Sequence, residues 1–309
     1  MTIAIAIHGG AGTLTREDMT GEKERAYRAA LATALDAGHA VLRRGGSALD
    51  AVTAAVLVME DDVLFNAGRG SAFALDGTIA MDASVMEGSA RRAGSVTGVT
   101  VARNPVLVAR CVMESTPNVM VGFQGADAIA RRFGLACEAP EYFRTQRRWD
   151  ALQLEKARME AGGTAEGVPE DRRHGTIGAV ALDEGGHLAA ATSTGGRTAK
   201  WVGRIGASPV IGAGTWADGT CAVSCTGDGE CFIRIAAAHD VAARMAYLGE
   251  TVAQASDHVI HGALAGMGST GGMVVVDAAG NVAMPFHCEG MYRAMVDGRG
   301  NRMIAIYPE

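Results

Sequence analysis

The sequence predicts an α+β fold in which antiparallel sheets are covered by helices. Short apolar segments of strand length recur in pairs joined by glycine turns, and the longer helical segments occur in blocks. Glycine accounts for 42 of the 309 residues, roughly twice the usual share of ~7%. Because no G-X-Y period accompanies them, these glycines are expected to serve turns and close backbone approaches.

The first half of the chain is expected to begin with a strand and to continue with helices. Residues 2–7 alternate with period two and precede the glycine turn Gly9-Gly10, which predicts a strand ending there. Residues 22–44 favour a helix stopped by glycine, and Ser47 is the predicted N-cap of a second helix over 48–60. The other expected elements are strands at 77–85, 95–102 and 119–121, and helices at 104–115, 124–133 and 149–160.

The second half is predicted to follow a linker and to be rich in strands. The linker is expected at about 161–175, since residues 161–173 (AGGTAEGVPEDRR) combine glycines and charges with a single sizeable apolar residue. Beyond it we expect strands at 177–182, 188–194, 208–211, 222–226, 273–276, 282–285 and 303–307, and helices at 230–247 and 251–264.

Charge and hydropathy argue against several classes of partner. The net charge is −6 at pH 7 and the arginines are scattered among acids, so no basic stripe suits nucleic acid. The longest apolar run, 51–59, is far shorter than the ~20 residues of a membrane helix. The first residues lack a basic segment and resemble a strand more than a signal peptide, which predicts a cytoplasmic location.

The common catalytic and metal motifs are missing or incomplete. The sequence has no G-x-S-x-G, Walker A or HExxH motif. Cys221, Cys225 and Cys231 lack CxxC spacing and are expected to be buried thiols, not zinc ligands. His258 and His261 have helical spacing but no further ligand, which favours a solvated or core pair.

One glycine-rich segment resembles a nucleotide-binding motif without its context. Residues 266–271 match G-x-G-x-x-G, yet they lead into the strand-like GMVVVD and do not join a strand to a helix. Dinucleotide binding is therefore not expected.

Thr176 has the setting of an N-terminal nucleophile. It follows the linker and Gly175, and it begins a predicted strand. If the bond between them were cut, Thr176 would carry a hydroxyl and an α-amine of pKa ~7.7–8.0, which can act as the base for that hydroxyl. Glycine before it would accept the strained geometry that turns its carbonyl toward the hydroxyl. The short HGT motif alone would not be specific.

Four segments in a fixed order give this threonine its context. They are HGTIGAVAL at 174–182, TSTGG at 192–196, GRIGASP at 203–209 and SCTGDGE at 224–230. Together they resemble the plant-type L-asparaginase and isoaspartyl peptidase family of N-terminal nucleophile hydrolases. Further segments of the same pattern are IHGGAG at 7–12, GSALDAV at 46–52, FNAGRG at 65–70, MDASVMEG at 81–88, AGSVTGV at 93–99, NPV at 104–106, GNVAMPF at 280–286 and EGMYRA at 289–294.

The resemblance implies one self-processing domain over residues 1–309. The family fold is an αββα sandwich of two antiparallel sheets flanked by helices. Cleavage before Thr176 would give an α subunit, 1–175, and a β subunit, 176–309, with a dimer of such pairs expected. No catalytic cofactor is implied.

The resemblance also implies roles for individual threonines. Thr176 would be the nucleophile toward substrate, and Thr194 the second threonine that hydrogen-bonds near it. Thr226 and the backbone N–H of Gly227 would form the oxyanion hole, where one donor is worth on the order of 3 kcal/mol. Asn66 would support the nucleophile.

Substrate and metal contacts are implied in the same way. Arg204 would bind the substrate α-carboxylate, which suits a bidentate guanidinium, and Gly229 would offer a main-chain contact. The main-chain carbonyls of Glu60, Val63 and Phe65 would hold a structural sodium ion.

The chain departs from the family pattern at one substrate contact. Where the family has aspartate to pair with the α-ammonium, this sequence has Ala207. An unpaired desolvated charge costs ~2–5 kcal/mol, so plain L-asparagine is expected to be a poor substrate. Asp228 could supply a carboxylate, although an exposed turn residue is the simpler interpretation. Arg197 and Trp201 are expected near the pocket, where they could favour a masked amine, an acidic group or an aromatic leaving group.

The sequence thus predicts a threonine amidohydrolase acting on the β-amide or isopeptide bond of asparagine-like or β-aspartyl compounds. One alternative is an uncleaved, inactive family member that acts as a binding protein; retention of the threonines argues against it. Another is a glycosylasparaginase-like hydrolase, against which stands HGT in place of an aspartate before Thr176.

Overall fold

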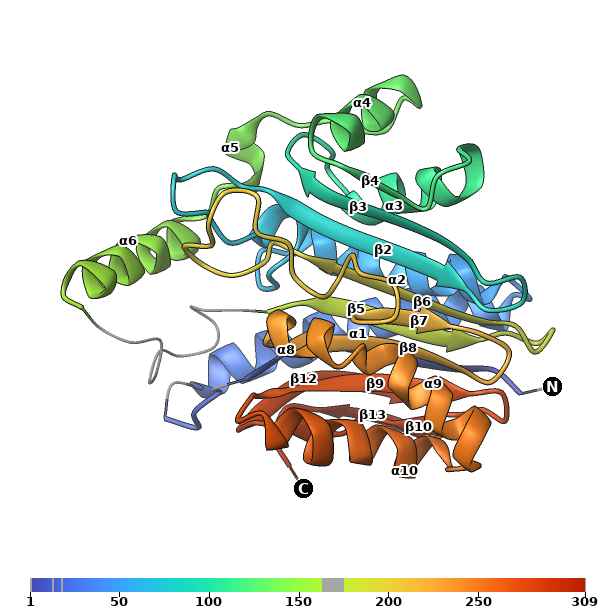
Figure 1. The fold of residues 1–309 in the computed structure, drawn as a ribbon. Helices are drawn as coiled ribbons and strands as arrows, with labels where there is room; N and C mark the ends of the chain where they lie inside the picture. Colours follow the sequence, from blue (N-terminus) through green and yellow to red (C-terminus); the bar gives the residue numbers. More distant parts are fainter. Residues whose placement is uncertain (1, 13, 18, 163–174, 309) are drawn as a thin grey trace.

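Two β-sheets lie face to face at the centre of the molecule, and helices cover the outer face of each (Figure 1). The computed structural model describes residues 2–12, 14–17, 19–162 and 175–308. In this part of the chain the larger sheet has eight strands, antiparallel except for one parallel pair at its edge. In spatial order they are β13 (Arg302–Ala305), β12 (Gly290–Val296), β1 (Ala4–Gly12), β5 (Ile177–Leu182), β6 (Leu188–Thr194), β2 (Met81–Glu87), β3 (Arg92–Val99) and β4 (Met120–Gly122).

The second sheet packs on the inner face of the first and is antiparallel. Its central pair runs in register from Cys221↔Asp277 to Gly227↔Gly271, so one end of this sheet is made of glycines. Its strands are β10 (Val282–Ala283), β9 (Gly271–Asp277), β8 (Cys221–Gly227) and β7 (Thr215–Ala217), with β11 (Phe286–His287) also paired to β9.

Helices complete four layers, which confirms the αββα class (Figure 1). The helices over the eight-stranded sheet are α1 (Gly21–Arg43), α2 (Ala48–Asp61) and α3 (Pro105–Ser115). Those over the second sheet are α8 (Gly229–Arg234), α9 (Ala237–Leu248), α10 (Val252–Asp257) and the π-helix η2 (His258–Leu264). The remaining ones are η1 (Gly68–Gly70), α4 (Gln124–Arg132), α5 (Pro140–Phe143) and α6 (Gln146–Glu160).

Helix ends that carry a capping residue or a proline lie where the sequence predicts them. The side chain of Thr20 accepts from the N–H of Lys23 at the start of α1, and Ser47 caps α2 by accepting from the N–H of Asp50. Pro105 occupies the first turn of α3. The predicted limits of α1 to α4 are confirmed to within one residue.

Several predicted strands differ from the observed ones. The first strand does not end at Gly9 but continues to Gly12, because a bulge between His8 and Gly10 keeps the glycines paired with β12. β12 itself was not predicted. Residues 208–211 form no strand; the pairing strand is β7, which begins at Thr215.

The long helix predicted over 230–247 is broken in two. Ala236 has φ +48°, a left-handed conformation that ends α8 and lets α9 start in a new direction. The helix predicted over 251–264 also differs from the structure, because it changes to a π-helix at His258. The predicted linker falls mainly on residues 163–174, outside the described residues. No helix in the described ranges has the length and apolar character needed to cross a membrane.

A chain of buried hydroxyls connects the two sheets beneath one end of the sandwich. Ser84 of β2 donates to Thr215 (2.7 Å), which donates to Thr192 of β6 (2.6 Å). Thr192 lies 2.7 Å from Ser224 of β8, which in turn contacts His8 of β1 (2.9 Å). A fully bonded polar network of this kind fixes the relative position of the strands that carry it.

Candidate active site

Thr176 and Thr194 meet at the end of the two central strands. β5 and β6 are antiparallel with Ile177 opposite Ser193, so the residue before β5 faces the last residue of β6. The Thr176 hydroxyl donates to Thr194 Oγ1 at 3.2 Å, and both side chains are buried. The predicted pair is therefore brought together by strand register.

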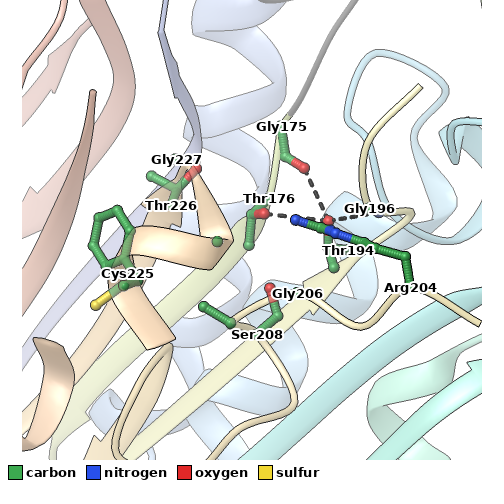
Figure 2. Close-up of a pocket in the computed structure, with 13 residues that line it drawn as sticks. Gly175, Thr176, Thr194, Gly196, Arg204, Gly206, Ser208, Cys225, Thr226 and Gly227 are labelled. Atoms are coloured by element: carbon green, nitrogen blue, oxygen red, sulfur yellow. Dashed lines mark hydrogen bonds between the residues drawn. The ribbon is translucent and has the colours of Figure 1, made fainter. Parts of the chain in front are cut away.

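The carbonyl oxygen of Gly175 accepts two hydrogen bonds beside this pair. Thr194 Oγ1 donates to it at 2.9 Å (Figure 2), and Asn66 Nδ2 also donates to it at 2.9 Å. Asn66 also donates to the carbonyl of Gly196 at 2.6 Å, while the N–H of Gly196 donates to Thr194 Oγ1 at 2.9 Å. The carbonyl group next to Thr176 is thus polarised by two fixed donors.

Gly175 has a backbone conformation that requires glycine. Its φ is +136°, and a Cβ atom there would lie 2.9 Å from Cβ of Asn66. Gly10, in the bulge of β1, also lies close to Gly175. A Cβ atom on Gly10 would come within 3.3 Å of Gly175 Cα. The bulged glycines of β1 therefore leave room for the Gly175–Thr176 bond.

Thr226 and Gly227, at the end of β8, line the same pocket from the second sheet (Figure 2). The Thr226 side chain is 2% exposed, and its hydroxyl has no hydrogen-bond partner. A buried hydroxyl without a partner is costly, by about 1–3 kcal/mol, unless a ligand uses it. A Cβ at Gly227 would meet the carbonyl oxygen of Thr270 at 2.5 Å, so only glycine fits.

Arg204 lines the pocket and is held there by Glu230. Its Nε and Nη2 donate to the two carboxylate oxygens of Glu230 at 2.8 and 2.7 Å. These bonds lower the pKa of Glu230 to about 2. Gly206 and Gly229 leave space for the Arg204 guanidinium. A Cβ atom on Gly206 would lie 2.8 Å from Nη1, and one on Gly229 would lie 3.1 Å from Nη2. No motif in the sequence indicates Glu230 as a partner of Arg204.

The wall beside Arg204 has no carboxylate where Ala207 stands. Ala207 is buried and lines the pocket with a methyl group. Asp228 does not line it: its Oδ2 accepts from Ser269 Oγ at 3.4 Å and from Cys231 Sγ at 3.6 Å. The carboxylate that Asp228 could have supplied is therefore directed elsewhere.

His8 is a site residue that sequence reasoning missed. Its Nδ1 lies 2.9 Å from the carbonyl oxygen of Thr176, and its Nε2 lies 2.9 Å from Ser224 Oγ. Since a carbonyl only accepts, Nδ1 carries the proton and Ser224 donates to Nε2. Burial lowers the pKa of His8 from 6.5 to about 3, so the ring is neutral as these bonds require. The only signal was the HGG motif at 8–10.

The loop after α2, predicted to hold a sodium ion, folds back over two of the three predicted carbonyls. A Cβ atom on Gly68 would lie 2.3 Å from the carbonyl oxygen of Glu60, and one on Gly70 would lie 2.0 Å from the carbonyl oxygen of Phe65. The carbonyl of Val63, in contrast, accepts from the Arg147 guanidinium at 2.9 Å, and that positive charge opposes a cation there. No cluster of His, Cys, Asp or Glu in the described residues suits a metal ion.

The side chain of Glu60 is a buried acid behind Thr194. Its Oε1 accepts from Ser193 Oγ at 2.6 Å and from the N–H of Val106 at 3.0 Å. Burial raises the pKa of Glu60 from 4.5 to about 8, so the carboxyl group is mostly protonated at neutral pH.

Glu60→Gln is expected to flatten the fall in stability between about pH 4.5 and 8. Because the folded pKa lies above the unfolded one, the stabilisation is full below pH 4.5 and is lost as the pH rises toward 8. The free energy of unfolding should fall by up to about 1.4 kcal/mol per pH unit in the wild type relative to the variant. Denaturant midpoints measured at each pH test this. Glu22→Gln, on the exposed start of α1, should keep the wild-type slope; equal slopes in all three proteins would refute the assignment.

Comparison with known proteins identifies the family. A family model described as asparaginase matches residues 1–306. Isoaspartyl peptidase of Salmonella typhimurium (strain LT2) is 48% identical over 293 residues, 94% of this chain and 94% of that protein. Isoaspartyl peptidase of Escherichia coli (strain K12) is 48% identical over 295 residues, 94% and 91% of the two chains. Plant-type L-asparaginase of Pyrococcus horikoshii is 40% identical over 304 residues, 96% and 97% of the two chains. The chain therefore belongs to the asparaginase family, the isoaspartyl peptidase and L-asparaginase-like hydrolases.

Proposed function

We propose that this protein is a self-processing N-terminal threonine amidohydrolase that cleaves the β-amide or isopeptide bond of asparagine-like or β-aspartyl compounds. The main support is the arrangement at Gly175: its carbonyl accepts from two fixed donors, and the Thr176 hydroxyl bonds to one of them, Thr194. The family and the names of the relatives agree with this chemistry.

The first reaction is cleavage of the chain itself. The Thr176 oxygen attacks the Gly175 carbonyl carbon, and Asn66 Nδ2 and Thr194 Oγ1 stabilise the charge that develops on the carbonyl oxygen. The C–N bond breaks as the acyl group moves to the Thr176 oxygen, the hydroxyl proton passes to the nitrogen that becomes the α-amine, and water hydrolyses the resulting ester. The products are residues 1–175 and 176–309, and we propose that two such pairs assemble as a dimer.

The second reaction is hydrolysis of a substrate amide by the new N-terminus. The free amine of Thr176 takes the proton of its own hydroxyl, and the oxygen attacks the substrate β-carbonyl. The unpartnered Thr226 hydroxyl and the N–H of Gly227 stabilise the second oxyanion. Arg204 binds the α-carboxylate, and the main chain at Gly229 contacts the substrate. The substrate C–N bond breaks, and the amine or ammonia leaves with the proton that the Thr176 amine had taken. Water then hydrolyses the ester and releases the acyl group from Thr176.

We also propose a structural sodium ion in the loop after α2. The carbonyl oxygens of Glu60 and Phe65 would hold it, since hard cations prefer oxygen ligands and the folded-back loop brings other backbone close to both. The ion would order the segment that leads to Asn66 and would take no part in the reaction.

The substrate range follows from Ala207. Without a carboxylate at this position, a free α-ammonium meets no acidic side chain among the described residues that line the pocket. Release of aspartate or ammonia from L-asparagine, from a β-aspartyl dipeptide and from an N-acyl-asparagine tests the proposed activity directly. Hydrolysis of none of the three would overturn it.

Ala207→Asp is expected to raise L-asparaginase activity. The new carboxylate would pair with the substrate ammonium, and a gain of about 2 kcal/mol corresponds to roughly 30-fold in kcat/KM. Steady-state kinetics with L-asparagine measure the effect. Ala207→Asn, which adds similar volume without charge, should give no such gain. If the aspartate variant is no better than the asparagine variant, this view of the pocket is wrong.

A further inference from the structure

A second cavity adjoins the active-site pocket. It encloses ≈ 300 Å³ between α6, the segment after β6 and α8. Arg204 lines both cavities, and Gly196 of the pocket is followed in the chain by Arg197 of the second cavity. A group attached to a substrate held by Arg204 would therefore extend toward this space.

Donors without acceptors line the second cavity. The Thr198 side chain is 4% exposed, and its hydroxyl has no hydrogen-bond partner. Arg158 donates through Nε to Glu155 at 2.9 Å, but its Nη1 is buried and has no partner. In the described residues the Arg197 side chain pairs with no carboxylate. Buried donors in this state are stabilised by a ligand that accepts hydrogen bonds.

The charge of the wall favours an anion. Its two carboxylates, Glu155 and Glu230, are already bound to Arg158 and Arg204. Among the described residues, this leaves the Arg197 guanidinium without a carboxylate partner, beside Arg158 Nη1 and the Thr198 hydroxyl. Guanidinium and hydroxyl donors of this kind match a carboxylate, which accepts several hydrogen bonds at once.

We propose that the second cavity binds a carboxylate on the N-terminal side of an isoaspartyl residue, so that the enzyme takes peptides in which an acidic residue precedes that residue. The proposal rests on the function proposed above. In such a peptide the isoaspartyl α-amine is a neutral amide, so Ala207 leaves no charge unpaired. The free α-carboxylate still binds Arg204, and the preceding residue extends into the adjoining cavity.

The reaction is unchanged in its chemistry. Water adds across the isopeptide bond: the β-carbonyl becomes a carboxylate on the N-terminal peptide, and the proton goes to the amine of the leaving residue. No further reactant is required.

The test compares three synthetic peptides: Glu-(β-Asp)-Leu, Gln-(β-Asp)-Leu and the free dipeptide β-Asp-Leu. Release of leucine by the wild type should be about tenfold faster in kcat/KM for the Glu peptide than for the Gln peptide, as expected for a charge-assisted bond. In an Arg158→Ala and Arg197→Ala double variant the ratio should approach one. Thr198→Val, which removes only the unpartnered hydroxyl, should lower the same ratio and guards against a folding defect in the double variant.

A matched control is Arg131→Ala. Arg131 lies exposed in the last turn of α4, as Arg158 lies in the last turn of α6, so both changes remove the same kind of helix-end charge. The control should keep the wild-type ratio. Equal rates on the Glu and Gln peptides by a wild type that cleaves β-Asp-Leu would overturn the second-cavity proposal alone. Failure to cleave any of the three would overturn the proposed function and, with it, this inference.

Discussion

Thr176→Ala is expected to leave the chain uncut and inactive. The change removes the hydroxyl that donates to Thr194 and that would attack the Gly175 carbonyl, while the Gly175 carbonyl keeps both of its donors. Loss of a catalytic nucleophile lowers kcat by about 10⁴-fold or more. A denaturing gel should show one chain for the variant and two fragments for the wild type, with the smaller one beginning at Thr176.

Thr176→Ser is the matched control for this variant. Serine keeps the hydroxyl and loses only a methyl group from a buried site, so cleavage should still occur and hydrolysis should remain measurable. Cleavage of the alanine variant at the same bond would exclude Thr176 as the nucleophile of processing. A wild type that stays uncut yet hydrolyses β-aspartyl compounds at full rate would separate catalysis from processing altogether.

The fold could be predicted where its signals are local. The caps at Thr20 and Ser47 and the proline of α3 lie within a few residues of the ends they fix, and those ends are confirmed. β12 was missed because its identity as a strand depends on pairing with β1, from 278 to 291 residues away in the chain. The break at Ala236 could not be predicted either, since an alanine gives no local sign of a left-handed conformation.

The sequence predicts the site residues that belong to motifs. It does not predict the contacts that side chains make with main-chain atoms far away in the chain. Motifs indicate both Thr194 and Thr226; strand register places Thr194 opposite Thr176, and Thr226 lines the same pocket from the second sheet. Asn66 was expected only as a supporting residue, because its bond to the Gly175 carbonyl joins groups 109 residues apart. His8 binds a main-chain oxygen 168 residues away, and such a contact leaves no pattern in side-chain spacing.

The donors for the two proposed reactions are different groups in the structure. Asn66 and Thr194 donate to the Gly175 carbonyl, whereas the Thr226 hydroxyl lines the pocket without a partner among the described residues. A single variant should therefore be able to spare processing while it impairs hydrolysis. This separation would not arise if one oxyanion hole served both steps.

Thr226→Val is expected to be cut normally and to hydrolyse substrate about 100- to 1,000-fold more slowly in kcat, with little change in KM. The magnitude is that of one lost oxyanion donor, ~3–4 kcal/mol. Valine has nearly the shape of threonine, and the missing hydroxyl breaks no bond in the free protein, so the free energy of unfolding should hardly change.

Thr192→Val is the control for the loss of a buried hydroxyl, because it is expected to lower the free energy of unfolding and to change kcat little. The Thr192 hydroxyl bonds to both Thr215 and Ser224 between the sheets, so its removal should lower the free energy of unfolding by about 1–3 kcal/mol. Its effect on kcat should be far smaller than that of Thr226→Val, because Thr192 does not line the pocket. Gel analysis, denaturant unfolding and steady-state kinetics on the two variants distinguish the cases. A Thr226→Val protein with wild-type kcat, or one that fails to process, would show that this hydroxyl does not act as a separate oxyanion donor for substrate.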